Sequence, residues 1–215
     1  MIATSKIFSL GFLFLGMFIL IQVILPIVSF QLWELGQKIE SNSNFVSPQS
    51  GGGQAVLGVS IENKDNFPFF VSKNIRQEAP SYNRFSISIP KLKIDNLSVD
   101  VDSNDLSNGL AHLPGSGLPG EKGNVFISGH SALSQLFSLK TATFGKLQDL
   151  KKGDQIILEA EGTQFIYQVE ELKVVDPKDL SVINPPDKMG RFVSLMTCVP
   201  PGLNFKRLIV LGKII

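Results

Sequence analysis

Three side chains that can do chemistry stand at the ends of apolar runs in this sequence. Cys198, the single cysteine, ends a run that begins at Phe192, and Arg207 opens a second run after a turn that contains two prolines and a glycine. His130 ends a third run, which begins at Asn124. A strand, a turn and a returning strand would bring the guanidinium close to the sulfur, and a nearby cation favours the reactive thiolate. We therefore interpret Cys198 as a candidate nucleophile and His130 as its acid–base partner.

Each of these residues also has a simpler interpretation. A lone cysteine is more often a small buried hydrophobic residue, and a histidine or arginine at a strand end usually makes only a hydrogen bond or a solvated charge. Their combination favours the catalytic interpretation. Thr197 is a candidate for substrate contact, but a β-branched strand residue explains it as well. His112 is the rival histidine; it lies among turn residues, so we expect His130 to be the catalytic one.

The blocks around these residues resemble the sortases, cysteine transpeptidases that attach proteins to the cell wall. In chain order the blocks are Gly109 to Ser116, Pro119 to Glu121, Gly123 to His130, Phe144 to Asp154, and Thr197 to Val210. The resemblance covers roughly residues 85–215. The eight residues between Cys198 and Arg207 resemble the spacing of the pilin-assembling and related classes, and the sequence leaves open which class of single-anchor sortase this is. It implies a closed β-barrel with an active site made of Cys198, His130 and Arg207.

The resemblance also implies a reaction. The Cys198 thiolate would attack the carbonyl of a sorting-signal peptide in a secreted protein, which divides one amide exchange into acylation and deacylation. His130 would protonate the leaving amine and later accept a proton from the incoming amine, which belongs to a peptidoglycan precursor or a protein lysine. Arg207 stays protonated and would hold the substrate and stabilise the oxyanion. No cofactor is expected, and one cysteine with two histidines falls short of the four ligands of a structural zinc site.

Hydrophobic periodicity predicts a mainly β fold for residues 84–215. Alternating segments are typical of strands, and only one stretch has helical spacing. The expected strands include Phe85–Ile89, Leu97–Val101, Asp154–Ala160 and Thr163–Val175, the last two joined by a tight Glu161-Gly162 turn, and the helical stretch is Leu133–Leu150. About eight short strands with one or two short helices indicate a closed eight-stranded barrel.

The N-terminal residues 1–33 predict a transmembrane anchor. Ile7 to Phe30 are 24 residues without a charge, which as a helix would reach about 36 Å, enough for a hydrocarbon core of about 30 Å. A signal peptide is the competing interpretation, but its apolar region is shorter and no cleavage site is evident. Lys6 before the run favours a cytoplasmic N-terminus and a catalytic domain outside the cell membrane, and Trp33 fits the outer interface.

The composition of residues 34–83 predicts a connecting segment. Ser41 to Asn44 and Ser50 to Gln54 have the composition of flexible linkers. Asn66 to Val71 is too apolar for a simple tether, and we expect it to pack on the domain. Pilin-assembling sortases carry an Asp-Pro-aromatic lid motif, which this segment does not match because two residues separate Asp65 from Pro68.

Composition excludes some functions and leaves two alternatives. With 43% apolar residues and a net charge of +1, the chain has room for one ordinary domain and no basic surface for nucleic acid. L,D-transpeptidases also use a cysteine on a β-rich fold, but Val-Pro-Pro after Cys198 does not match their His-Gly-Cys-Arg signature. The other alternative is a membrane-tethered barrel that binds wall polymer or peptide without catalysis.

Overall fold

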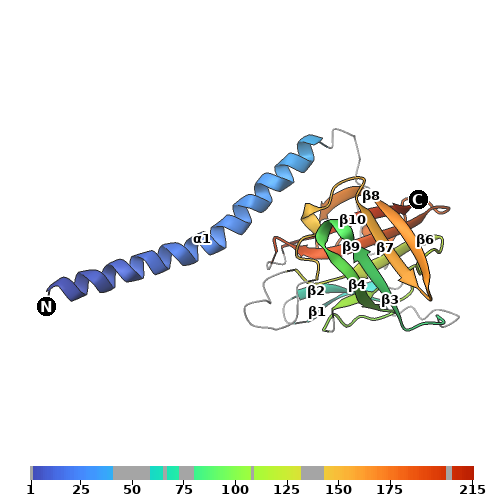
Figure 1. The fold of residues 1–215 in the computed structure, drawn as a ribbon, viewed down its shortest axis with the longest axis horizontal. Coiled ribbons are helices and arrows are strands. Elements are labelled where there is room, and N and C mark those ends of the chain that lie inside the picture. The colour runs from blue at the N-terminus through green and yellow to red at the C-terminus, as the bar shows by residue number, and fades with distance from the viewer. Residues whose placement is uncertain are drawn as a thin grey trace. The chain divides into compact units, whose positions relative to one another are not determined.

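The computed structural model describes residues 2–40, 59–64, 67–72, 80–107, 109–131, 143–201 and 205–215. The chain divides into two units, Met1–Ser47 and Pro48–Ile215, which are coloured along the chain in Figure 1. The first unit contains one long helix, α1 (Ile2–Glu40).

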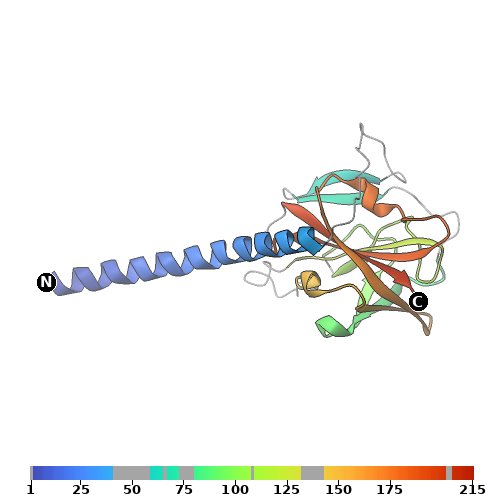
Figure 2. The ribbon, with the colours of Figure 1, turned by 90° about the horizontal axis from the view of Figure 1, so that it is seen from above.

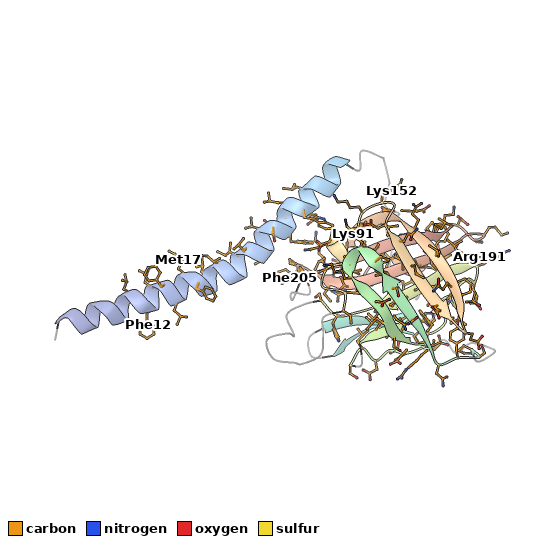
Figure 3. The ribbon with its side chains drawn as sticks, viewed as in Figure 1. Phe12, Met17, Lys91, Lys152, Arg191 and Phe205 are labelled. Atoms are coloured by element: carbon orange, nitrogen blue, oxygen red, sulfur yellow. The ribbon has the colours of Figure 1, made fainter. Side chains whose placement is uncertain are left out.

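Helix α1 carries large apolar side chains that are mostly exposed. Between Leu10 and Leu35 the exposed residues include Phe12, with 72% of its surface accessible, and Met17, with 54%. Figure 3 shows both side chains pointing away from the helix. No helix in the part of the chain that the structure describes is both long enough and apolar enough to qualify as a membrane span.

The second unit contains a closed barrel of eight strands, in the order β10-β8-β7-β3-β4-β5-β6-β9, seen from two directions in Figures 1 and 2. The strands are β3 (Arg84–Ile89), β4 (Ile94–Asp100), β5 (Leu110–His112), β6 (Gly123–Ser128), β7 (Gln155–Ala160), β8 (Thr163–Val175), β9 (Arg191–Val199) and β10 (Lys206–Ile214). The predicted closed eight-stranded barrel is therefore confirmed.

The sequence pattern explains why these strands form where they do. In β3 every second side chain, Phe85, Ile87 and Ile89, is buried, as expected for a half-buried strand with a period of two. The turn between β7 and β8 has a positive φ at both Glu161 and Gly162, the conformation that a two-residue hairpin loop with matching twist requires.

Strands β6 and β9 form a parallel pair, and the candidate site lies at one end of it. Phe126 on β6 lies opposite Ser194 on β9, and Val125 lies opposite Val193. Both strands are buried over most of their length, which fits their nearly continuous apolar sequence because a parallel strand is covered on both faces.

Two features of the barrel differ from the sequence prediction. Strand β5 pairs with β4 in parallel and with β6 in antiparallel orientation, whereas the sequence suggested only turn residues around His112. Three residues are too few to display an alternating pattern. The described part of the predicted helix, from residue 143, forms a turn and a 3₁₀-helix, η4 (Leu147–Asp149), while residues 132–142 lie outside the described chain. Two further 3₁₀-helices among the described residues are η2 (Pro90–Leu92) and η5 (Leu180–Ile183).

A separate two-stranded sheet precedes the barrel. Strand β1 (Val59–Lys64) pairs with β2 (Phe67–Ser72) in antiparallel orientation. The predicted packing of Asn66 to Val71 on the domain depends on side chains that lie outside the described residues, as do the predicted linkers at 41–44 and 50–54. Those interpretations stay predictions.

Candidate active site

Cys198 and Arg207 lie directly opposite each other on neighbouring strands. The antiparallel register of β9 and β10 pairs Cys198 with Arg207. Opposed residues of an antiparallel pair point to the same face, with Cβ atoms about 4.5–5.5 Å apart. The thiol is partly buried and Arg207 is 2% exposed, so the guanidinium acts on the sulfur from a site with little water.

His130 reaches the same end of the sheet from the other side of β9. Strands β6 and β9 run parallel with Ser128 opposite Met196, and both chains continue for two residues, to His130 and Cys198. The backbone N–H of Gly129 donates to the carbonyl of Met196 at 3.0 Å, which extends this pairing by one residue. The structure thus brings the three predicted residues to one end of three adjacent strands.

Gly129, the residue before His130, is packed so closely that it leaves no room for a side chain. A Cβ atom there would lie 2.5 Å from Cδ2 of Leu110 and 2.6 Å from Cδ2 of Phe144. The backbone N–H of Phe144 also donates to the carbonyl of His130 at 3.1 Å. The main chain of His130 is therefore held, while its side chain is exposed. The sequence analysis missed this role of Gly129 and Phe144, although a glycine immediately before the histidine was visible.

Thr197 is buried, and its hydroxyl is used inside the barrel. Oγ1 donates to the carbonyl of Gly129 at 3.1 Å, and the residue is 3% exposed. This contact ties the residue beside the nucleophile to the residue beside the histidine. The structure therefore gives Thr197 a positioning contact, and its substrate contact stays a prediction.

Burial controls the ionisation of the nucleophile more than the neighbouring charge does. Burial raises the pKa of the Cys198 thiol above its ordinary value, and the positive charge of Arg207 lowers it by a smaller amount. The sequence analysis expected the guanidinium to favour the thiolate; that influence has the expected sign, but desolvation outweighs it. A neutral thiol therefore predominates at neutral pH.

His112 occupies a very different environment. It is fully buried, and its Nε2 lies 2.8 Å from both the carbonyl of Gly117 and Oγ of Ser116. Nδ1 accepts the backbone N–H of Asp102 at 3.3 Å. Both ring nitrogens are thus occupied by the protein, as expected for a histidine that holds the structure together.

A buried apolar cluster lies beside the candidate nucleophile. Met196 pairs with Ile209 on the same face as Cys198 and Arg207, one pleat further along. Met196 and Ile209 belong to one buried cluster, whose other members are Leu113, Phe126, Val175 and Ile183. Each member of the cluster is at most 6% exposed, and the residues Leu180 and Val182 that pack against it are partly accessible. The sequence analysis did not identify this cluster.

The arrangement combines a nucleophile, a proton carrier and a fixed cation. These are the groups that acyl transfer needs: sulfur to form the covalent intermediate, imidazole to move protons, and a donor for the oxyanion. Among the residues that the structure describes, no group of three or more His, Cys, Asp or Glu side chains could hold a metal ion.

Comparison with known proteins agrees with this geometry. The sequence model of the sortase domain matches residues 87–215, more than half of the chain. The chain belongs to the sortase family. Sortase D of Bacillus subtilis is 31% identical over 131 residues, which are 59% of this chain and 61% of that protein. The chain thus matches less than two thirds of the length of this relative.

Solved sortase structures share the fold. The sortase C-1 of Actinomyces oris gives a TM-score of 0.54 at 31% identity, covering 61% of this chain and 71% of that one. Sortase A of Corynebacterium diphtheriae gives 0.55 at 33% identity, covering 65% and 63%. These solved structures support both the barrel fold and the membership of this chain in the sortase family.

Proposed function

We propose that this sortase is a cysteine transpeptidase that cleaves a sorting-signal peptide of secreted proteins and transfers them to an amine acceptor at the cell surface. The observation that carries the proposal is the pairing of Cys198 with Arg207 on β9 and β10, with His130 at the end of the adjoining strand β6. Membership of the sortase family adds support.

The proposed reaction begins with acylation. The sulfur of Cys198 attacks the carbonyl carbon of the scissile peptide bond, and the negative charge moves to the carbonyl oxygen. Because burial raises the pKa of this thiol, its proton leaves as the sulfur attacks, and His130 accepts it. Collapse of the tetrahedral intermediate breaks the C–N bond, His130 gives the proton to the leaving amine, and a thioester remains on Cys198.

The second half of the reaction is aminolysis. An incoming amine attacks the thioester carbonyl and loses a proton to His130, which returns a proton to the departing sulfur. Arg207 cannot exchange protons, since its guanidinium stays charged; it donates hydrogen bonds to the oxyanion in both halves. The acceptor amine is a peptidoglycan precursor or a protein lysine.

A transfer assay tests the proposal. The full-length protein in detergent is incubated with a library of fluorophore–quencher peptides, with and without hydroxylamine as a small amine. We expect cleavage of some members, a hydroxamate product when hydroxylamine is present, and an acylated form of the protein by intact mass spectrometry. A protein that binds peptides without cleaving any, and that forms no acylated species, would support the binding-module alternative instead.

We also propose that residues 7–30 anchor the protein in the cell membrane with the catalytic unit outside. This rests on the sequence: 24 residues without a charge, preceded by Lys6. The exposure of apolar side chains such as Phe12 and Leu15 along α1 adds support, because a helix that is apolar on all sides needs cover from lipid or protein.

Two measurements test the anchor and its orientation. Mass spectrometry of the membrane-extracted protein should find residues 7–30 still attached. Protease added to cells stripped of their wall should cut between Ser41 and Gln54. A mature chain that begins after Phe30 would contradict the anchor, and a linker that is protected until the membrane is broken would contradict the orientation.

A further inference from the structure

The segment between β8 and β9, residues 176–190, packs over the buried apolar cluster beside the nucleophile. Its 3₁₀-helix η5 contributes Ile183, 1% exposed, to the same cluster as Met196 and Ile209. Leu180 and Val182 of η5 pack against this cluster. The position of η5 therefore sets where the partly accessible Leu180 and Val182 lie, next to the buried cluster that is one pleat away from Cys198.

The hydrogen bonds made by acidic residues of this segment are local. Asp176 accepts the N–H of Lys178, and Asp179 accepts the N–H and hydroxyl of Ser181. Asp187 accepts the N–H groups of Met189 and Gly190. Such turns give the segment its own shape, but they do not attach η5 to the barrel.

Asn124 makes the attachment. It lies on β6 and is 4% exposed, and its Nδ2 donates to the carbonyl of Ile183 at 3.0 Å, with the carbonyl of Val182 at 3.5 Å. Its backbone carbonyl accepts the N–H of Gly117 at 2.8 Å. A single residue thus joins η5 and the chain before β6 to the strand that precedes His130.

The orientation of this amide follows from its surroundings. Oδ1 of Asn124 is buried without a hydrogen-bond partner among the residues that the structure describes. Rotating the amide by 180° would place Oδ1 against the two carbonyl oxygens and leave them without a donor, which costs more than one unpaired acceptor. The protein accepts an unpaired buried oxygen in order to present the NH₂ group to η5.

We propose that Asn124 is a positioning residue that holds η5 against the barrel and thereby sets the affinity for the donor peptide. The inference rests on the proposed transpeptidase function. In an extended donor peptide whose scissile carbonyl lies at Cys198, neighbouring peptide residues would reach η5, where Leu180 and Val182 are partly accessible beside the buried Met196–Ile209 cluster. Freeing η5 would move Leu180 and Val182 away from the bound peptide while leaving the thiol, the imidazole and the guanidinium in place.

Two substitutions and one matched control test this. Asn124→Asp keeps the size and Oδ1 but replaces the donor with a second acceptor, and Asn124→Leu keeps the approximate volume and removes both polar groups. The control is Ser194→Ala. Ser194 lies on β9 and is 1% exposed, and its Oγ is also buried with no partner in the described part of the chain. It is as buried as Asn124, but its side chain makes no attachment to η5, so its hydroxyl can be removed without loss.

We expect both Asn124 variants to raise the KM for a donor peptide roughly tenfold, with kcat changed far less, because ground-state binding is what is lost. The donor is the best-cleaved member of the fluorophore–quencher library, and the dependence on hydroxylamine concentration should be unchanged. Hydrogen exchange of residues 176–190 in the full-length protein should accelerate, while alkylation of Cys198 by iodoacetamide keeps its rate. Ser194→Ala should match the wild type in the donor kinetics, the hydroxylamine dependence, the hydrogen exchange and the alkylation rate.

The outcomes separate this inference from the proposed function. Wild-type protein that turns over no peptide would remove the transpeptidase function, and the inference with it. Active wild-type protein with an unchanged donor KM in the Asn124 variants would overturn the inference alone. Faster exchange with unchanged KM would make Asn124 merely structural. If Asn124→Asp does not fold, Asn124→Leu decides by the same measurements, and equal losses in Ser194→Ala would attribute the effect to packing.

Discussion

The two histidines of this sortase occupy contrasting regions of adjacent strands. His112 ends β5, where it pairs with Ile127 of β6, and His130 follows the end of β6. The His112 ring is completely buried, with hydrogen bonds at both nitrogens, and an edge-on contact with Phe85 at 5.9 Å between ring centroids. The His130 side chain is exposed, and the backbone on either side of it holds the residue in place.

The contrast teaches that position and environment, rather than residue type, decide which histidine can do chemistry. A proton carrier must reach the substrate with a ring nitrogen, so the protein has to fix its main chain and leave its ring accessible. At His112 the protein does the opposite: the ring joins β5 to the turn at Asp102 and to Gly117. Four predictions break or sharpen this comparison.

The largest effect is expected at the nucleophile that His130 serves. Cys198→Ala should reduce peptide cleavage and transfer by more than about a thousandfold, because a covalent intermediate can no longer form. The fold should persist, since the partly buried thiol is replaced by a small apolar side chain. Fluorogenic cleavage and circular dichroism of the full-length variant measure the two parts. Ordinary turnover without the sulfur would remove the covalent mechanism and the role of His130 in it.

The second prediction is a crossed pair of effects in the two histidine variants. His130→Ala should lower the acylation rate by about 10²–10⁴-fold with little change in thermal stability, since an exposed side chain is removed. His112→Ala should lower the free energy of unfolding by about 2–4 kcal/mol, because it leaves a cavity and unpaired groups at Asp102 and Gly117. The folded fraction should keep most of its activity.

Thermal unfolding and single-turnover acylation of both variants give the comparison. The assignment would be reversed if His112→Ala slowed acylation more than His130→Ala at a temperature where both are folded. Equal losses of thermal stability in the two variants would contradict the prediction that the exposed His130 side chain contributes little to folding.

The third prediction concerns the cation opposite the thiol. Arg207→Lys should lower kcat/KM by about 10–100-fold, because lysine keeps the charge but loses the planar set of donors that can hold an oxyanion and a peptide backbone together. Iodoacetamide should alkylate Cys198 at a nearly unchanged rate in this variant, since the charge beside the sulfur is retained. Wild-type kinetics in the lysine variant would mean that Arg207 supplies only charge.

Much of this arrangement could be predicted from the sequence. The alternation in β3, the Glu161-Gly162 turn and the apolar runs of β6 and β9 are local signals, and they predicted the barrel. The grouping of Cys198, His130 and Arg207 followed from reading strand ends and a turn, with support from a family resemblance. That resemblance gave roles that spacing alone could not give.

Other parts of the site depend on contacts between distant residues and had no local signal. The short strand β5 has too few residues to show a pattern. The hydrogen bonds from Asn124 to Ile183 and from Thr197 to Gly129 join residues that are 59 and 68 positions apart in the sequence. The net direction of the Cys198 pKa shift was also beyond the sequence, because it depends on how deeply the thiol is buried.

The last and smallest effect is the pH dependence of that thiol. The neutral form of cysteine is the protonated one, so burial that disfavours the anion raises the pKa, as found for Cys198. The rate of alkylation by iodoacetamide should therefore rise with pH to a midpoint above the ordinary value of about 8.5. Arg207→Gln removes the positive charge that lowers this pKa, so the midpoint of this variant should move higher and its alkylation rate near neutral pH should fall. His112→Ala should leave the midpoint unchanged, because that ring is buried in the other region. A wild-type midpoint below about 8.5 would mean that the guanidinium outweighs burial, and it would place a preformed thiolate beside His130.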